Sequence, residues 1–161
     1  MSKRLLIALA ASLLSLGLWA QNLPDVTVQD VNGRSVSTLS MIDGQTPFIV
    51  TFWASWCRPC MEELAAIEDA APDWTGDFPL RIYAVSVDDS RSLSNAKAVA
   101  ASNDWPVTVL FDTRQQFKQA FRISSIPQVF IFDKNGRQVY THLGFVPGGE
   151  IELLEKLQEA K

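Results

Sequence analysis

The feature that most constrains this sequence is a pair of cysteines placed directly between a strand and a helix. Residues 48–53 (FIVTFW) form an apolar, β-prone run, as expected for a strand buried on both faces. Over residues 57–71 the apolar spacing becomes helical, and the pattern ends before Pro72. Cys57 and Cys60, the only cysteines of the chain, therefore lie at the start of the predicted helix.

This position gives a thiol a particular chemistry. Free N–H groups and the helix dipole favour negative charge in the first turn, so a thiol there ionises more readily. Arg58 adds a positive charge, and Pro59 suits an early helical position because it fixes φ and lacks an N–H. Since only a thiolate attacks a disulfide sulfur, Cys57 is the candidate nucleophile. Cys60, one turn further on, is placed to resolve the mixed disulfide.

Other interpretations of the cysteine pair stay open. An inert structural disulfide would be a poor cross-link, because a bridge across two residues closes a very short loop. A zinc site would need four ligands, and His142 is the only further Cys or His in the chain. A copper-delivery module would combine soft cysteine ligands with a histidine. His142 itself is expected to pack or to face solvent on the last strand.

The composition is that of an ordinary globular protein. The 161 residues fit one domain, with 47% hydrophobic and 20% charged residues, which argues against a disordered chain. The net charge is −4, and no cluster of Lys and Arg is present that could neutralise phosphates. We therefore expect no nucleic-acid partner.

The first twenty residues have the layout of a secretory signal peptide. Lys3 and Arg4 precede an uncharged, apolar or small-residue run, which ends at Ala20 before a polar stretch. Cleavage after Ala20 would leave residues 21–161 as a single domain. The run is shorter than the roughly 20 residues that span a bilayer as a helix. The alternative is an uncleaved anchor, which would be the only membrane contact.

The mature chain alternates strands with helices. An Asn32-Gly33 turn signal within residues 24–39 predicts a small N-terminal hairpin. Further strands are predicted at residues 80–87, 107–111, 128–132 and 137–143, and further helices at residues 90–102, 113–121 and 150–161. This order predicts an α/β three-layer domain with a mixed central sheet.

Three segments resemble thioredoxin-like proteins. Residues 52–60 (FWASWCRPC) resemble their active-site segment, and with Glu63 the pattern is most similar to the TlpA/ResA group of exported thioredoxins. Ile126-Pro127 is similar to the family's cis-proline site, and residues 128–144 to its closing hairpin. The resemblance extends over residues 24–161 and implies the thioredoxin-like three-layer fold.

The resemblance also implies roles for individual residues. Cys57 would be the exposed nucleophile and Cys60 the resolving thiol. Trp56 would shape the surface that meets the substrate, although it can also be a packing aromatic. Pro127 would be cis, which leaves the backbone of Ile126 free to pair with an extended substrate segment.

One position departs from thioredoxin itself, which has a buried Asp in the strand beneath the cysteines. Thr51 stands at that position and cannot take up a proton at neutral pH. Glu63 is the group's alternative acid, and the resemblance implies a buried carboxyl with a raised pKa that exchanges protons with Cys60. The alternative is an exposed Glu63, like its neighbours Glu62 and Glu68.

The function that the resemblance implies is that of a periplasmic disulfide reductase. It would take electrons from a membrane thiol donor and pass them to oxidised protein substrates, with no cofactor and no metal. A net oxidase or isomerase is the rival within the same class, because Arg58 should stabilise the Cys57 thiolate and raise the potential. Outside that class, a copper-binding thioredoxin-like module is the alternative.

Overall fold

In the computed structural model, the apolar run before the cysteines is the strand β3 (Phe48–Trp53), and all six of its residues are buried. β3 pairs in parallel with β4 (Ile82–Ser86) and antiparallel with β6 (Gln128–Phe132). Both of its edges are therefore hydrogen-bonded and both of its faces are covered, as the continuous apolar sequence predicts.

The structure describes residues 21–161. The predicted signal peptide, residues 1–20 with its cleavage site, lies outside the described residues. Among the helices of the described part, none combines the length and the apolar character needed to cross a membrane.

The remaining strands complete a mixed, seven-stranded sheet. They are β1 (Thr27–Gln29), β2 (Ser35–Ser37), β5 (Thr108–Phe111) and β7 (Gln138–Leu143). The sheet order is β2-β1-β5-β4-β3-β6-β7, with β3, β4 and β5 mutually parallel and β1, β6 and β7 antiparallel to their neighbours. β1 and β2 form the predicted N-terminal hairpin.

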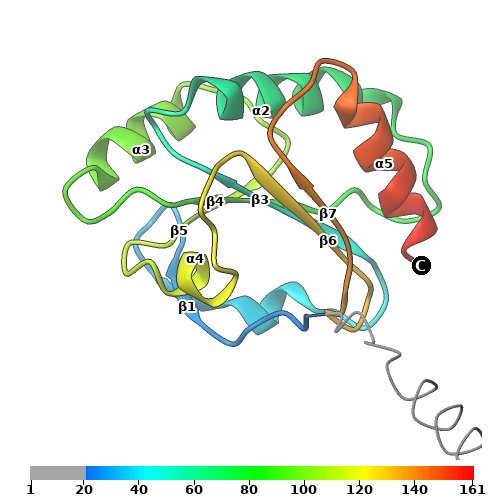
Figure 1. Cartoon of the computed structure of the whole chain (residues 1–161), viewed down its shortest axis with the longest axis horizontal. Helices are drawn as coiled ribbons and strands as arrows, with labels where there is room; N and C mark the ends of the chain where they lie inside the picture. The colour runs from blue at the N-terminus through cyan, green and yellow to red at the C-terminus, as the bar shows by residue number, and fades with distance from the viewer. Residues whose placement is uncertain (1–20) are drawn as a thin grey trace, which may run out of the picture.

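Helices cover both faces of the sheet, which confirms the predicted three layers. They are α2 (Arg58–Ala70), α3 (Leu93–Ala101), α4 (Gln116–Ala120) and α5 (Gly149–Glu159), with short 3-10 helices η2 (Thr38–Met41) and η3 (Ala71–Asp73). Figure 1 shows α2, α3 and α5 on one face, and α4 with the N-terminal segment on the other. α4 is shorter than predicted because Gln115 and Arg122 adopt positive φ values of 58° and 52° on either side of it.

The two faces of the sheet have cores of different character. On the α4 side the core is aromatic, with ring centroids 5.0 Å apart for Phe52 and Phe117 and 4.5 Å apart for Phe121 and Phe130. On the α2 and α5 side it is aliphatic and includes Ile49, Ile67, Ile131, Leu153 and Leu157. Because side chains alternate along β3, Thr51 lies on the α2 side of the sheet, where it meets Glu63.

The start of the described chain is fastened to the turn between β6 and β7. Leu23 N–H donates to the Gly136 carbonyl (2.8 Å), and Gln138 N–H donates to the Gln21 carbonyl (2.9 Å). Gly136 has a φ of +78°, and a Cβ there would lie 2.4 Å from Ile42 Cδ1, so this close approach requires glycine. The chain thus enters the fold at the edge of the sheet where β3 begins.

Candidate active site

Cys57 and Cys60 form a disulfide at the first turn of α2. Cys57 is the N-cap residue, and its Sγ accepts a hydrogen bond from Cys60 N–H at 3.3 Å. Pro59 lies in the first turn, as its missing N–H favours. Cys57 is 5% exposed and Cys60 is 1% exposed. The expectation of an exposed Cys57 is therefore wrong for the disulfide form, because its sulfur turns inward to cap the helix and to bond Cys60.

The Ile126–Pro127 peptide bond is cis, as predicted. β6 begins at Gln128, whose Cα pairs with that of Phe52 near the end of β3. This register places Pro127 at the same edge of the sheet as the loop that leads to Cys57. The Pro127 carbonyl accepts a hydrogen bond from Gly144 N–H (2.8 Å), so the loop after β7 lies beside the proline.

Trp56 is 70% exposed, so its side chain is not a core packing residue. Together with Val87, Asp89, Arg91 and other residues, it lines an open hollow of about 560 Å³ beside the cysteine loop. A large aromatic side chain next to the nucleophile offers an apolar contact to a docking molecule.

Glu63 is buried, with 2% of its surface exposed, and it lies one turn from Cys60 on the same face of α2. Its Oε1 accepts a hydrogen bond from Thr51 Oγ1 at 2.6 Å. Burial raises the pKa of Glu63 to about 7, and the Thr51 hydrogen bond lowers it in part. The implied buried acid is present, and Thr51 contributes a hydrogen bond from the position where thioredoxin has an Asp.

The guanidinium of Arg58 forms an ion pair with Glu62. Its Nε lies 2.9 Å from Glu62 Oε1, and its side chain is 90% exposed. Arg58 does follow Cys57 directly, but its charge is paired with Glu62 and exposed to solvent, which reduces its effect on the Cys57 site. The reason is visible in the sequence, because residues four apart on a helix face each other.

A polar network that the sequence analysis did not identify holds the cysteine loop in place. Asp88, 1% exposed, follows β4 and accepts hydrogen bonds from Ser55 N–H (2.8 Å) and Ser55 Oγ (2.7 Å). Ser86 Oγ donates to the same carboxylate, and Asn95 Nδ2 donates to Ser55 Oγ. The available signal was an acidic residue directly after the predicted strand 80–87, at the edge of the sheet where parallel strands end.

Within residues 21–161, no group of three or more His, Cys, Asp or Glu side chains is arranged to hold a metal ion. His142 lies on β7, with its Cα paired to that of Val129 in β6. The structure therefore does not bring His142 to the cysteine pair as a ligand set.

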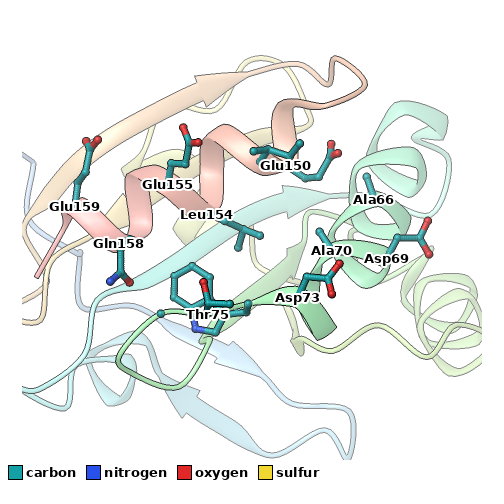
Figure 2. A pocket seen from close by; sticks show the side chains of 13 residues that line it. Ala66, Asp69, Ala70, Asp73, Thr75, Glu150, Leu154, Glu155, Gln158 and Glu159 are labelled. Atoms are coloured by element: carbon teal, nitrogen blue, oxygen red, sulfur yellow. The ribbon is translucent and has the colours of Figure 1, made fainter.

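A second, larger hollow lies away from the disulfide. It has a volume of about 830 Å³ and lies between the second half of α2, α5 and the segment after η3 (Figure 2). Its lining includes Ala66, Ala70, Trp74, Leu154 and several carboxylates. Cys57 is at the opposite end of α2, so this hollow is not part of the cysteine site.

Comparison with known proteins agrees with a redox-active cysteine pair at this site. The model of the AhpC/TSA family matches residues 20–140. The thiol–disulfide oxidoreductase ResA of Geobacillus thermodenitrificans is 27% identical over 71% of this chain, which spans 63% of that relative's length.

Solved structures confirm the thioredoxin-like fold. An uncharacterized thioredoxin-like protein from Porphyromonas gingivalis has a TM-score of 0.74 and 39% identity, covering 88% of this chain and 92% of its own. A putative thiol:disulfide interchange protein DsbE from Chlorobium tepidum has a TM-score of 0.75 and 23% identity, covering 88% of this chain and 96% of its own. The chain belongs to the AhpC/TSA family and is a thioredoxin-like thiol–disulfide oxidoreductase with Cys57 and Cys60 as its Cys-x-x-Cys pair.

Proposed function

We propose that this protein is a periplasmic disulfide reductase that takes electrons from a membrane thiol donor and reduces oxidised protein substrates. The observation that supports reduction over oxidation of substrates is the buried Glu63, one helical turn from Cys60. Its ionised form opposes a thiolate nearby, which destabilises the reduced form of the couple. A couple with a less stable reduced form gives up its electrons more readily.

The charge of Arg58 supports the same direction. In the sequence alone, Arg58 favoured an oxidase because it would stabilise the Cys57 thiolate. Its ion pair with Glu62 engages that charge at the surface instead. The principal argument for an oxidase is thereby weakened.

The first half of the reaction uses Cys57. Its thiolate attacks one sulfur of the substrate disulfide, the substrate S–S bond breaks, and the released substrate thiolate takes a proton from water. The product is a mixed disulfide between Cys57 and the substrate. The N-terminal end of α2 favours the negative charge of the attacking sulfur.

The second half uses Cys60 and Glu63. The Glu63 carboxylate accepts the proton of the Cys60 thiol, and the Cys60 sulfur then attacks Cys57. The substrate leaves with its second thiol, so it has gained two electrons and the Cys57–Cys60 disulfide has formed. A pKa of about 7 suits this transfer, because both protonation states of Glu63 are populated at neutral pH. Two thiols of the donor then reduce the disulfide.

The shape of the site supports a protein substrate. The exposed Trp56 lies on the sheet edge that carries Pro127, and Gly144 ties the loop after β7 to this edge. Leu143 at the end of β7 and Val146 in that loop are also exposed, at 57% and 62%. An open apolar surface around a disulfide suits an extended protein segment, which would pair with the backbone at Ile126.

Trapping of the intermediate tests the mechanism. In the Cys60→Ser variant, mixed disulfides with substrate proteins should accumulate, because no thiol remains to release them. The matched Cys57→Ser variant should trap few. Equal trapping by the two variants would refute the assigned roles.

The reduction potential tests the direction. A Cys57–Cys60 couple markedly more reducing than glutathione supports the reductase, whereas a couple near the potential of DsbA, about −120 mV, would establish an oxidase. Insulin reduction with and without added copper separates both from a copper-binding module. Periplasmic location rests on residues 1–20, and a mature chain that begins at Gln21 in the periplasmic fraction would support it.

A further inference from the structure

A second buried carboxylate, which the mechanism above does not use, lies beside the cysteine loop. Both oxygens of Asp88 serve as acceptors: Oδ2 accepts from Ser55 N–H and Ser86 Oγ, each at 2.8 Å, and Oδ1 accepts from Ser55 Oγ at 2.7 Å. Ser55 precedes Cys57 by two residues. Asp88 therefore joins the end of β4 to the loop that carries the nucleophile.

The donors to Asp88 are all uncharged. Ser55 Oγ, which donates to the carboxylate, itself accepts from Asn95 Nδ2 at 2.9 Å. In the part of the chain from residue 21 onward, no Lys, Arg or His forms an ion pair with Asp88. The adjacent Asp89 and Arg91 pair with each other at 2.8 Å. The uncharged hydrogen-bond donors thus stabilise the negative charge of Asp88, and no cation among the described residues pairs with it.

This charge is close enough to act on the thiol chemistry. Two residues of chain span about 7 Å, so the carboxylate lies within roughly 10 Å of the backbone of Cys57. A unit charge at that distance changes an ionisation equilibrium by roughly tenfold at the effective dielectric constant of a protein. Other charged groups near the cysteine loop are Glu63 of α2, the Arg58–Glu62 ion pair, and the Asp89–Arg91 ion pair, whose two residues line the hollow beside Trp56.

We propose that Asp88 is a positioning residue that fixes the Cys57 loop and whose charge keeps the Cys57–Cys60 couple reducing. The inference deepens the proposed reductase function and rests on it for its biological meaning. A negative charge beside the nucleophile disfavours the thiolate, which exists only in the reduced form. Asp88 and Glu63 would then act in the same direction, from the end of β4 and from α2 respectively.

The Asp88→Asn variant tests the charge, because the side chain keeps its shape and can keep two of its three acceptor contacts. We expect the pH midpoint of Cys57 alkylation to fall by up to about one unit, and the equilibrium constant for oxidation by glutathione disulfide to fall by up to about tenfold. Ser55→Ala is the matched control for anchoring, since it removes both hydrogen bonds of Ser55 Oγ, to Asp88 and from Asn95, and leaves the charge. Its midpoint should stay within about 0.3 units of the wild-type value, which corresponds to a twofold change.

An unchanged midpoint in a folded Asp88→Asn protein would overturn the inference. Equal shifts in Asp88→Asn and Ser55→Ala would also overturn it, because loop geometry and not charge would then control the thiol. If Asp88→Asn does not fold, Asn95→Asp decides, since Asn95 is exposed and the new charge faces Ser55. A higher pH midpoint of Cys57 alkylation in Asn95→Asp than in the wild type supports the inference, and an unchanged midpoint refutes it. Alkylation requires no substrate, so a protein that fails to reduce disulfides would contradict only the proposed function.

Discussion

Replacement of Glu63 by glutamine should make the protein relatively more stable as the pH rises. The pKa of Glu63 is raised by burial from its ordinary value of 4.5 to about 7. A carboxyl with a raised folded-state pKa contributes its full stability below pH 4.5, and this contribution is lost as the pH rises through 7. The shift corresponds to about 3 kcal/mol of unfolding free energy at pH 8. Glutamine does not ionise, so the variant should not show this loss.

The assay is urea denaturation of the oxidised protein between pH 5 and pH 8, where the disulfide keeps the cysteines from titrating. The quantity to compare is the change across this pH range, because an imperfectly paired glutamine amide adds a cost that does not depend on pH. The unfolding free energy of Glu63→Gln relative to wild type should rise by about 2–3 kcal/mol from pH 5 to pH 8. Glu62→Gln is the control, since Glu62 is exposed and paired with Arg58. A difference that does not change with pH would refute the raised pKa and with it the proton-transfer role.

Three further variants test other contacts. Thr51→Val removes the hydrogen bond that favours ionised Glu63, so the pKa of Glu63 should rise above about 7, and the pH midpoint for release of the mixed disulfide should rise with it. Trp56→Ala should raise KM for a protein substrate by roughly five- to thirtyfold, as loss of an interface aromatic does, and leave reduction of a small aromatic disulfide nearly unchanged. Phe52→Ala should lower the unfolding free energy by about 3–5 kcal/mol in urea denaturation, because it empties the centre of the aromatic core.

Local sequence information was sufficient for the core of the site. A continuous apolar run followed by the cysteine pair identified β3 and the start of α2, because strand burial and helix capping are both determined within a few residues. Glu63 could be placed next to Cys60 since three residues make about one helical turn. The same rule would have assigned Arg58 to Glu62, four residues away, had it been applied to that pair.

Contacts between distant residues were not accessible in this way. The hydrogen bonds between Ser55 and Asp88 join residues 33 positions apart, and they exist because β3 and β4 are parallel neighbours whose ends meet at one edge of the sheet. The sequence predicts both strands but not this pairing register. The inward turn of the Cys57 sulfur likewise depends on the disulfide and on the helix cap together.

The attachment of residues 21–23 to the β6–β7 turn fixes where the start of the described chain lies relative to the cysteines. That turn is at the edge of the sheet where β3 begins, whereas the cysteines follow the end of β3, about 20 Å away along a six-residue strand. If the chain were tethered through its N-terminus, the redox face would therefore be directed outward from the bilayer. A membrane-bound electron donor would then need a protruding segment that reaches past the length of the sheet to the cysteines. Otherwise the tethered protein would have to lie on its side against the membrane. A released chain would meet no such restriction, so comparing tethered and released forms with one donor would measure how much this orientation matters.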